Sequence, residues 1–228
     1  MKFDAESHWN KSHEGHPQNR PSSKYGIEKE KLYPRNSIIC DLGGGDGTDS
    51  LHFLRKGHTV FLYDISKSAL KMAIQKAGRE GLESKLKTFQ MDLAKGKIPI
   101  QENIFDVLYS RLSLHYFYQD KTIEILKEVH RVLKDSGIAY IAVKSPKDIK
   151  EMQFLRNNSR EIDKGVFVDN EGMTKSRFTK EQYKEMLKKA DIANFEINEY
   201  TEHFGKQRIY IKSKADYLQY LELVIRKS

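Results

Sequence analysis

The run 41–47, Asp-Leu-Gly-Gly-Gly-Asp-Gly, combines two acids with four glycines directly after an apolar stretch, residues 38–40. Glycine lets a loop turn sharply with positive φ and lets a ligand lie directly on the backbone. Residues 48–56 then have the pattern of a helix. A strand, a glycine loop and a helix N-terminus in this order form the ligand cradle of a nucleotide-binding α/β sheet.

The glycine spacing narrows the choice of nucleotide. A dinucleotide fingerprint needs glycines at i, i+2 and i+5. Counting from Gly43 places Thr48 at the third position, and counting from Gly45 places Ser50 there. A phosphate-binding P-loop would end in Gly-Lys-Ser or Gly-Lys-Thr, and no such tripeptide follows. The sequence therefore excludes both a dinucleotide-binding fingerprint and a phosphate-binding P-loop.

A further acid, Asp64, follows the next predicted strand, residues 59–63. In nucleotide-binding sheets an acid at the end of this strand binds the ribose. A carboxylate suits that task because it accepts hydrogen bonds from both ribose hydroxyls. An ordinary surface acid is the alternative for Asp64, and the position after the glycine loop favours ribose binding.

Two further motifs follow in order. The third predicted strand leads into Gln90-Met91-Asp92-Leu93, and the fourth leads from Phe105 into a loop from Ser110 to His115. With the glycine loop and Asp64, these motifs over residues 36 to about 145 resemble those of class I S-adenosylmethionine-dependent methyltransferases. The resemblance implies that the chain binds S-adenosylmethionine through Asp41, Gly43, Gly44 and Gly45 at the methionine part, Asp64 and Ile65 at the ribose, Asp92 and Leu93 at the adenine, and Ser110 after the fourth strand. For Asp92, a turn or helix cap is the alternative.

His115 lies just past the fourth strand, near the expected place of the methyl group. An ordinary histidine pKa of about 6.5 suits a general base near neutrality. A base is required only if the acceptor must lose a proton. The alternative is a structural histidine packed among its neighbours Leu114, Tyr116 and Phe117.

The composition limits the class of protein. Charged residues make up 32% of the 228 residues and no apolar run reaches the ~18 residues of a membrane span, so we expect a soluble chain without a membrane segment. The single cysteine, Cys40, lies inside the first strand, which excludes an internal disulfide and fits the cytoplasm. No metal-ligand pattern is present, so no metal site is predicted.

Strands alternate with helices along most of the chain, which predicts an α/β fold with a doubly wound, mostly parallel seven-stranded sheet. We expect strands at 37–40, 59–63, 86–90, 105–109, 138–143, 195–200 and 221–225, helices at 49–56, 67–79, 120–133 and 179–189, and a further short strand at 209–211.

The predicted domain covers residues 36–228, with 144–178 as an insertion over the carboxyl edge of the sheet. The insertion contains a predicted hairpin over 166–172 and is a candidate substrate cap. Residues 1–35 are polar and form no core element in this prediction. They are either a tail or a lid that folds over the ligand through Trp9.

We therefore expect methyl transfer to O, N, S or C of a small molecule. The loop 110–115 lacks the proline typical of amino-adenine methylation, and Cys40 is misplaced for carbon-5 cytosine methylation. The net charge of +8 keeps an RNA- or protein-directed methyltransferase as a less favoured alternative. A cofactor-binding protein without catalysis is the third hypothesis, because fold alone never fixes function. The sequence does not determine the oligomeric state.

Overall fold

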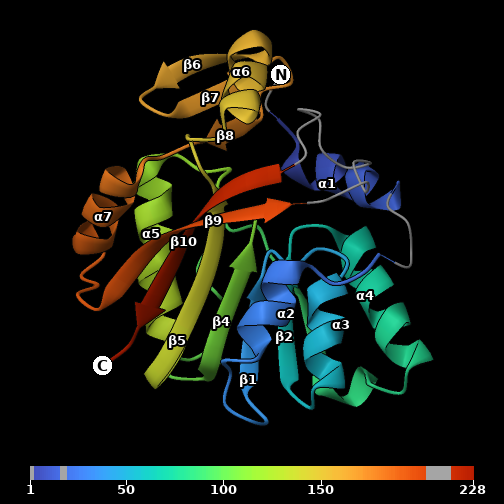
Figure 1. The fold of residues 1–228 in the computed structure, drawn as a ribbon. Helices are drawn as coiled ribbons and strands as arrows, with labels where there is room; N and C mark the ends of the chain where they lie inside the picture. Colours follow the sequence, from blue (N-terminus) through green and yellow to red (C-terminus); the bar gives the residue numbers. More distant parts are fainter. Residues whose placement is uncertain (1–2, 16–19, 204–216) are drawn as a thin grey trace.

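A seven-stranded sheet organises the computed structural model, which describes residues 3–15, 20–203 and 217–228 (Figure 1). Its strand order is β3-β2-β1-β4-β5-β10-β9, with β1 to β5 parallel and β10 antiparallel to both β5 and β9. The strands span β1 Ile38–Leu42, β2 Thr59–Asp64, β3 Leu86–Gln90, β4 Phe105–Arg111, β5 Leu133–Lys144, β9 Phe195–His203 and β10 Tyr217–Arg226. The doubly wound, mostly parallel seven-stranded fold predicted from the sequence is confirmed.

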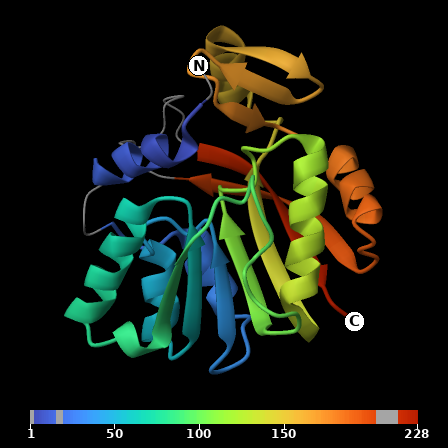
Figure 2. The ribbon, with the colours of Figure 1, turned by 180° about the vertical axis from the view of Figure 1, so that it is seen from behind.

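Helices cover both faces of this sheet. One face is packed by α2 Lys24–Glu30, α3 Thr48–Arg55 and α4 Lys67–Arg79, and the other by α5 Gln119–Val132 and α7 Lys180–Lys189 (Figures 1 and 2). A 3₁₀ turn, Glu83–Lys85, leads into β3. Each face has its own apolar core, because alternate strand residues point to opposite sides. In β4, Val107 and Tyr109 belong to the core under α2, α3 and α4. Phe105 and Leu108 belong to the core under α5 and α7.

The insertion forms a separate small layer beyond the carboxyl edge of the large sheet (Figure 1). It consists of α6 Ile149–Asn158 and a three-stranded antiparallel sheet, β6 Ser159–Asp163, β7 Val166–Asp169 and β8 Thr174–Ser176. The predicted hairpin is confirmed as β7 and β8, whereas α6 and β6 were not predicted. The reason is that α6 buries only Glu151 and Leu155, so it lacks a clear apolar stripe.

Most predicted elements are confirmed with longer strands. Strand β5 begins at Leu133 and not at Ile138, because Leu133 pairs with Phe105 across an irregularity in the ladder. Strands β9 and β10 form a long antiparallel ribbon that extends past the predicted ends. The predicted strand at 209–211 lies outside the described residues. No helix in the described ranges is long and apolar enough to span a membrane.

The expectation that residues 1–35 contribute no core element is wrong. Two helices form there, α1 Ala5–Glu14 and α2, and Tyr25 of α2 is 0% exposed. Its ring lies 5.8 Å from that of Tyr109 and 5.5 Å from that of Tyr200. Ser23 caps α2 by accepting from the Gly26 N–H, and both its backbone N–H and its hydroxyl donate to Asp49. The few aromatics of this polar segment do not recur at helical spacing, so the sequence gave no periodic signal of this docking.

Replacing Tyr25 tests this correction. Tyr25→Ala should lower the free energy of unfolding by about 3–5 kcal/mol, because it leaves a cavity between α2 and the sheet. Urea denaturation followed by circular dichroism measures the change. Leu32→Ala in the same segment is the matched control, since Leu32 is 61% exposed and should change stability by less than about 0.5 kcal/mol. Equal stability of Tyr25→Ala and wild type would show that this segment contributes nothing to the core.

Candidate cofactor site

The glycine loop connects β1 to α3 and is closely packed on both sides. Gly43, Gly45 and Gly47 have φ values of 71°, 57° and 68°, a region that side chains disfavour. A Cβ added to Gly43 would lie 2.3 Å from the Ser113 side chain, and one added to Gly44 would lie 2.4 Å from the Asp41 carboxyl carbon. Because these residues are glycines, no side chain of the loop covers its backbone at the end of β1.

Asp41 is buried beneath this loop, near the end of β1. One carboxylate oxygen accepts from the Ser50 hydroxyl at 2.6 Å, while Oδ1 has no hydrogen-bond partner in the described structure. Burial raises the pKa of Asp41 to about 8, and the neighbouring carboxylates Asp49, Asp64 and Asp46 add to that rise. A buried acid with a free oxygen is a ready partner for a cationic ligand group.

Asp64 joins the end of β2 to the glycine loop. Its two oxygens accept from the backbone N–H groups of Gly45 and Ser66, each at 2.8 Å. Burial raises its pKa, and these backbone donors act in the opposite direction. The carboxylate therefore lies beside the loop at the carboxyl edge of the sheet, where the sequence predicted it. Ile65 follows and is half-buried, and its carbonyl accepts from the Gln90 amide.

Asp92 and Leu93 lie in the turn after β3. Asp92 accepts from the backbone N–H of Ala94 and pairs with Lys95 at 3.0 Å, so in this state it caps a turn. Leu93 packs against the core on the α5 side. The adenine role of both residues stays a prediction.

Ser110 and His115 follow β4. The Ser110 hydroxyl donates to the carbonyl of Leu42 at 2.8 Å, which ties β4 to the start of the glycine loop. His115 is 0% exposed, and neither ring nitrogen has a hydrogen-bond partner among the described residues. Burial, followed by the charges of Arg177 and Lys144, holds its pKa well below the ordinary range. The expected near-neutral pKa is therefore wrong, because burial disfavours the charged ring, and the general-base role stays a prediction.

Helix α1 lies over the edge that carries these residues, a placement that the sequence offered only as one of two alternatives. The Asn10 side-chain oxygen accepts from the Ser66 hydroxyl at 2.9 Å and from the Ser68 N–H at 3.1 Å. A Cβ on Gly45 would lie 2.6 Å from the His13 ring. The Trp9 ring lies 5.1 Å from that of Tyr116. Helix α1 thus covers the ends of β1 and β2 and the loop after β4.

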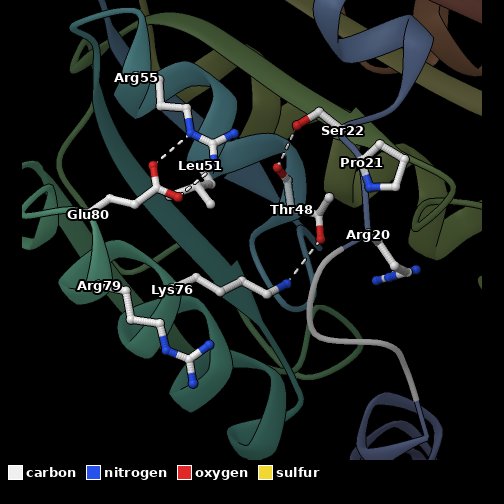
Figure 3. A pocket seen from close by; sticks show the side chains of 9 residues that line it. All are labelled: Arg20, Pro21, Ser22, Thr48, Leu51, Arg55, Lys76, Arg79 and Glu80. Carbon is white, nitrogen blue, oxygen red and sulfur yellow. Dashed lines mark hydrogen bonds and ion pairs between the residues drawn. The ribbon is translucent and has the colours of Figure 1, made fainter.

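An ion-pair cluster that sequence reasoning missed anchors the far side of the loop. Asp46 pairs with Arg20 and with Lys76, each at 2.9 Å. Burial alone would raise the pKa of Asp46, and the two cations lower it below the ordinary range. The sequence gives no signal of these ion pairs, because Arg20, Asp46 and Lys76 lie far apart in the chain. A 280 Å³ cavity adjoins this cluster (Figure 3) and is lined by Arg20, Pro21, Ser22, Thr48, Leu51, Arg55, Lys76, Arg79 and Glu80.

Comparison with known proteins agrees with this geometry. A family model described as a methyltransferase domain matches residues 39–137. Residues 39–137 therefore match a methyltransferase domain, and the fold around them is that of class I methyltransferases. S-adenosylmethionine is the cofactor of that class, and the described residues contain no cluster of three or more potential metal ligands.

Individual relatives share parts of the chain. An uncharacterized methyltransferase of Synechocystis is 31% identical over 49% of this chain and 49% of its own length. A mitochondrial protein of Mus musculus named an arginine-hydroxylase, NDUFAF5, is 30% identical over 44% of this chain and 27% of its own length. The chain therefore matches half or less of these curated relatives.

A solved structure shares the fold over most of the chain. It is the 1,6-didemethyltoxoflavin-N1-methyltransferase of Burkholderia thailandensis with bound 1,6-didemethyltoxoflavin and S-adenosylhomocysteine. The TM-score is 0.62 at 18% identity, and the match covers 90% of this chain and 79% of the other.

The raised pKa of Asp41 predicts a pH effect on stability. Between its ordinary value of 3.8 and about 8, the folded chain holds a proton that the unfolded chain has released, so this group lowers stability as pH rises through that window. Asp41→Asn keeps an acceptor for Ser50 and does not titrate. The free energy of unfolding of the variant minus that of wild type should therefore rise by roughly 1 kcal/mol or more from pH 5 to pH 9. Urea unfolding at both pH values measures this, and parallel profiles would contradict the raised pKa.

Proposed function

We propose that this chain transfers the methyl group of S-adenosylmethionine to a small-molecule acceptor. The observation that carries the proposal is the joint placement of the glycine loop, Asp41 and Asp64 at one point on the carboxyl edge of the sheet. Ligands of open α/β sheets bind at this edge.

The residues present fit the cofactor. S-adenosylmethionine carries a sulfonium and an ammonium group, both cationic. One buried oxygen of Asp41 has no partner in the described part of the chain, and burial and other acids raise the Asp41 pKa, so a cationic ligand would relieve this repulsion. Gly43 and Gly45 provide backbone against which the methionine part can lie, and Asp64 would accept from the ribose hydroxyls.

The cofactor supplies an electrophilic methyl group when bound. The task left to the chain is to hold an acceptor in line and to exclude water. Helix α1 and the insertion meet above the edge of the sheet: His8 lies 3.6 Å from Glu171, and Gly172 approaches Phe3. The region above the loop is thus covered from two sides.

This enclosure supports a small acceptor over RNA or protein, because a macromolecular substrate needs an open surface. The Burkholderia enzyme, which shares the fold and was solved with bound 1,6-didemethyltoxoflavin, supports the same choice. The relative named an arginine-hydroxylase shows that activity cannot be carried over by similarity alone. Turnover of the cofactor with any acceptor would exclude a non-catalytic role.

The ribose assignment is tested with Asp64→Ala. Loss of charge-assisted hydrogen bonds should weaken binding of S-adenosylmethionine and S-adenosylhomocysteine by about 10- to 100-fold in calorimetric titration. Asp135→Ala is the control, since Asp135 is exposed and lies near the start of β5, far along the strand from the carboxyl edge. Unchanged affinity in a folded Asp64→Ala variant would show that the ribose lies elsewhere.

The lid role of α1 is tested through Trp9, the single tryptophan of the chain. Because its ring contacts Tyr116 above the loop, entry of S-adenosylhomocysteine must move or enclose it. We expect a saturable change of tryptophan emission whose midpoint equals the calorimetric Kd. Asp64→Ala should shift that midpoint in parallel. Cofactor binding with constant emission would mean that α1 is a fixed part of the fold.

A further inference from the structure

A cluster of buried polar side chains lies beneath the insertion, beside the loop that follows β4. We call it the cap cluster, and its members are His115, Lys144, Glu151, Ser176, Arg177 and Tyr183. They come from five places in the sequence. The Ser176 N–H donates to the His115 carbonyl at 2.8 Å where β8 crosses that loop, and the charge of Arg177 acts on both His115 and Tyr183. His115 and Ser176 are 0% exposed, Tyr183 1% and Arg177 3%.

The carboxylates near this cluster are already engaged. Glu151 pairs with Lys144 at 2.7 Å and with Arg177 at 2.6 Å. Asp148, the cap of α6, accepts from the backbone N–H groups of Glu151 and Gln219. The acids thus hold the cations in place and leave few acceptor positions for further donors.

Several donors of the cluster have no acceptor within the described ranges. The Arg177 Nε, the hydroxyls of Ser176 and Tyr183 and both nitrogens of His115 are buried without a hydrogen bond. Each buried polar group without a partner destabilises the fold, because no hydrogen bond offsets its loss of hydration. The Arg177 Nε–H and one ring N–H of neutral His115 can only donate, and the two hydroxyls can donate as well. What the cluster lacks is therefore chiefly a group rich in acceptors.

The electrostatics at His115 agree with the missing acceptor being an anion. After burial, the two influences on its pKa are the positive charges of Arg177 and Lys144, and both act to lower it. The charge of Arg177 also lowers the pKa of Tyr183 against the effect of burial. A carboxylate or phosphate oxygen would accept from these donors in a field that favours it.

The cap cluster is linked to the proposed cofactor site by aromatic rings. The His115 ring lies 4.4 Å from that of Tyr116, which in turn lies 5.1 Å from Trp9 on α1. A molecule between these places would reach both the cap cluster and the edge where the methyl group is expected. Because His115 and Ser176 are fully buried, entry requires β8 to separate from the loop after β4.

We propose that the cap cluster binds an anionic oxygen group, a carboxylate or a phosphate, of the methyl acceptor. This proposal rests on the proposed methyltransferase function and narrows its substrates to acids. Arg177, Ser176 and Tyr183 are then specificity-determining residues that act in binding and not in chemistry.

The test titrates the full chain, saturated with S-adenosylhomocysteine, with acetate and with inorganic phosphate, and uses acetamide as the neutral match. Ring signals of a histidine-labelled sample report the site, with His115 assigned by His115→Gln. We expect saturable movement of the His115 signals below about 100 mM of one anion, and none with acetamide. General binding of anions to the basic surface would move other histidines instead.

Two conservative variants make the test specific. Ser176→Ala and Tyr183→Phe remove hydroxyls that have no partner among the described residues, so the melting temperature should not fall. Each should nevertheless weaken anion binding by about threefold to tenfold. Tyr33→Phe is the matched control, because its hydroxyl is equally buried and unpartnered but lies in the core on the α2 side.

The outcomes separate the two proposals. No anion-dependent shift, equal shifts with acetamide, or unchanged affinity in both variants would overturn the anion site and indicate that buried water satisfies the cap cluster. The cofactor titration with Asp64→Ala stands apart from these results. If the unmodified chain bound anions but neither S-adenosylmethionine nor S-adenosylhomocysteine, the methyltransferase role alone would be overturned.

Discussion

The rest of the structure depends on the attachment of the glycine loop to the ends of three neighbouring strands. The Gly43 N–H donates to the Tyr63 carbonyl at 2.7 Å, the Gly45 N–H donates to Asp64, and the Ser110 hydroxyl donates to the Leu42 carbonyl. Parallel strands bring these ends together, and glycine permits the backbone to pass between them. The same bonds that hold the sheet edge together also place the acids of the proposed cofactor site.

This edge concentrates buried acidic groups at a cost in stability. Asp41 and Asp64 both have raised pKa values because burial disfavours their charged forms. Asp46 is the exception, since Arg20 and Lys76 neutralise it. Functional sites commonly keep such perturbed acids because a ligand of opposite charge relieves the repulsion when it binds. Within the described residues Asp41 and Asp64 take part in no ion pair, and the proposed cofactor would use both.

The cap cluster is the electrostatic counterpart of that edge. There, Arg177 and Lys144 surround a neutral histidine, and the unsatisfied groups are mostly donors. A cationic cofactor on one side and an anionic acceptor on the other would each meet a complementary field. Helix α1 and the insertion, which contact each other at His8 and Glu171, cover the space above both. Methyl transfer benefits from this enclosure because it excludes competing water.

The sequence by itself determined the sheet and the places of Asp41, Asp64, Ser110 and the glycine loop, because strand periodicity and positive-φ glycines are local signals. It determined neither the docking of Tyr25 nor the position of α1, since both depend on contacts with residues distant in sequence. The state of His115 also needed the tertiary structure: its residue type suggested a base, but burial beside Arg177 and Lys144 removed the near-neutral pKa. Burial and local charge depend on which residues surround a side chain in the folded protein, so the residue type alone does not determine them.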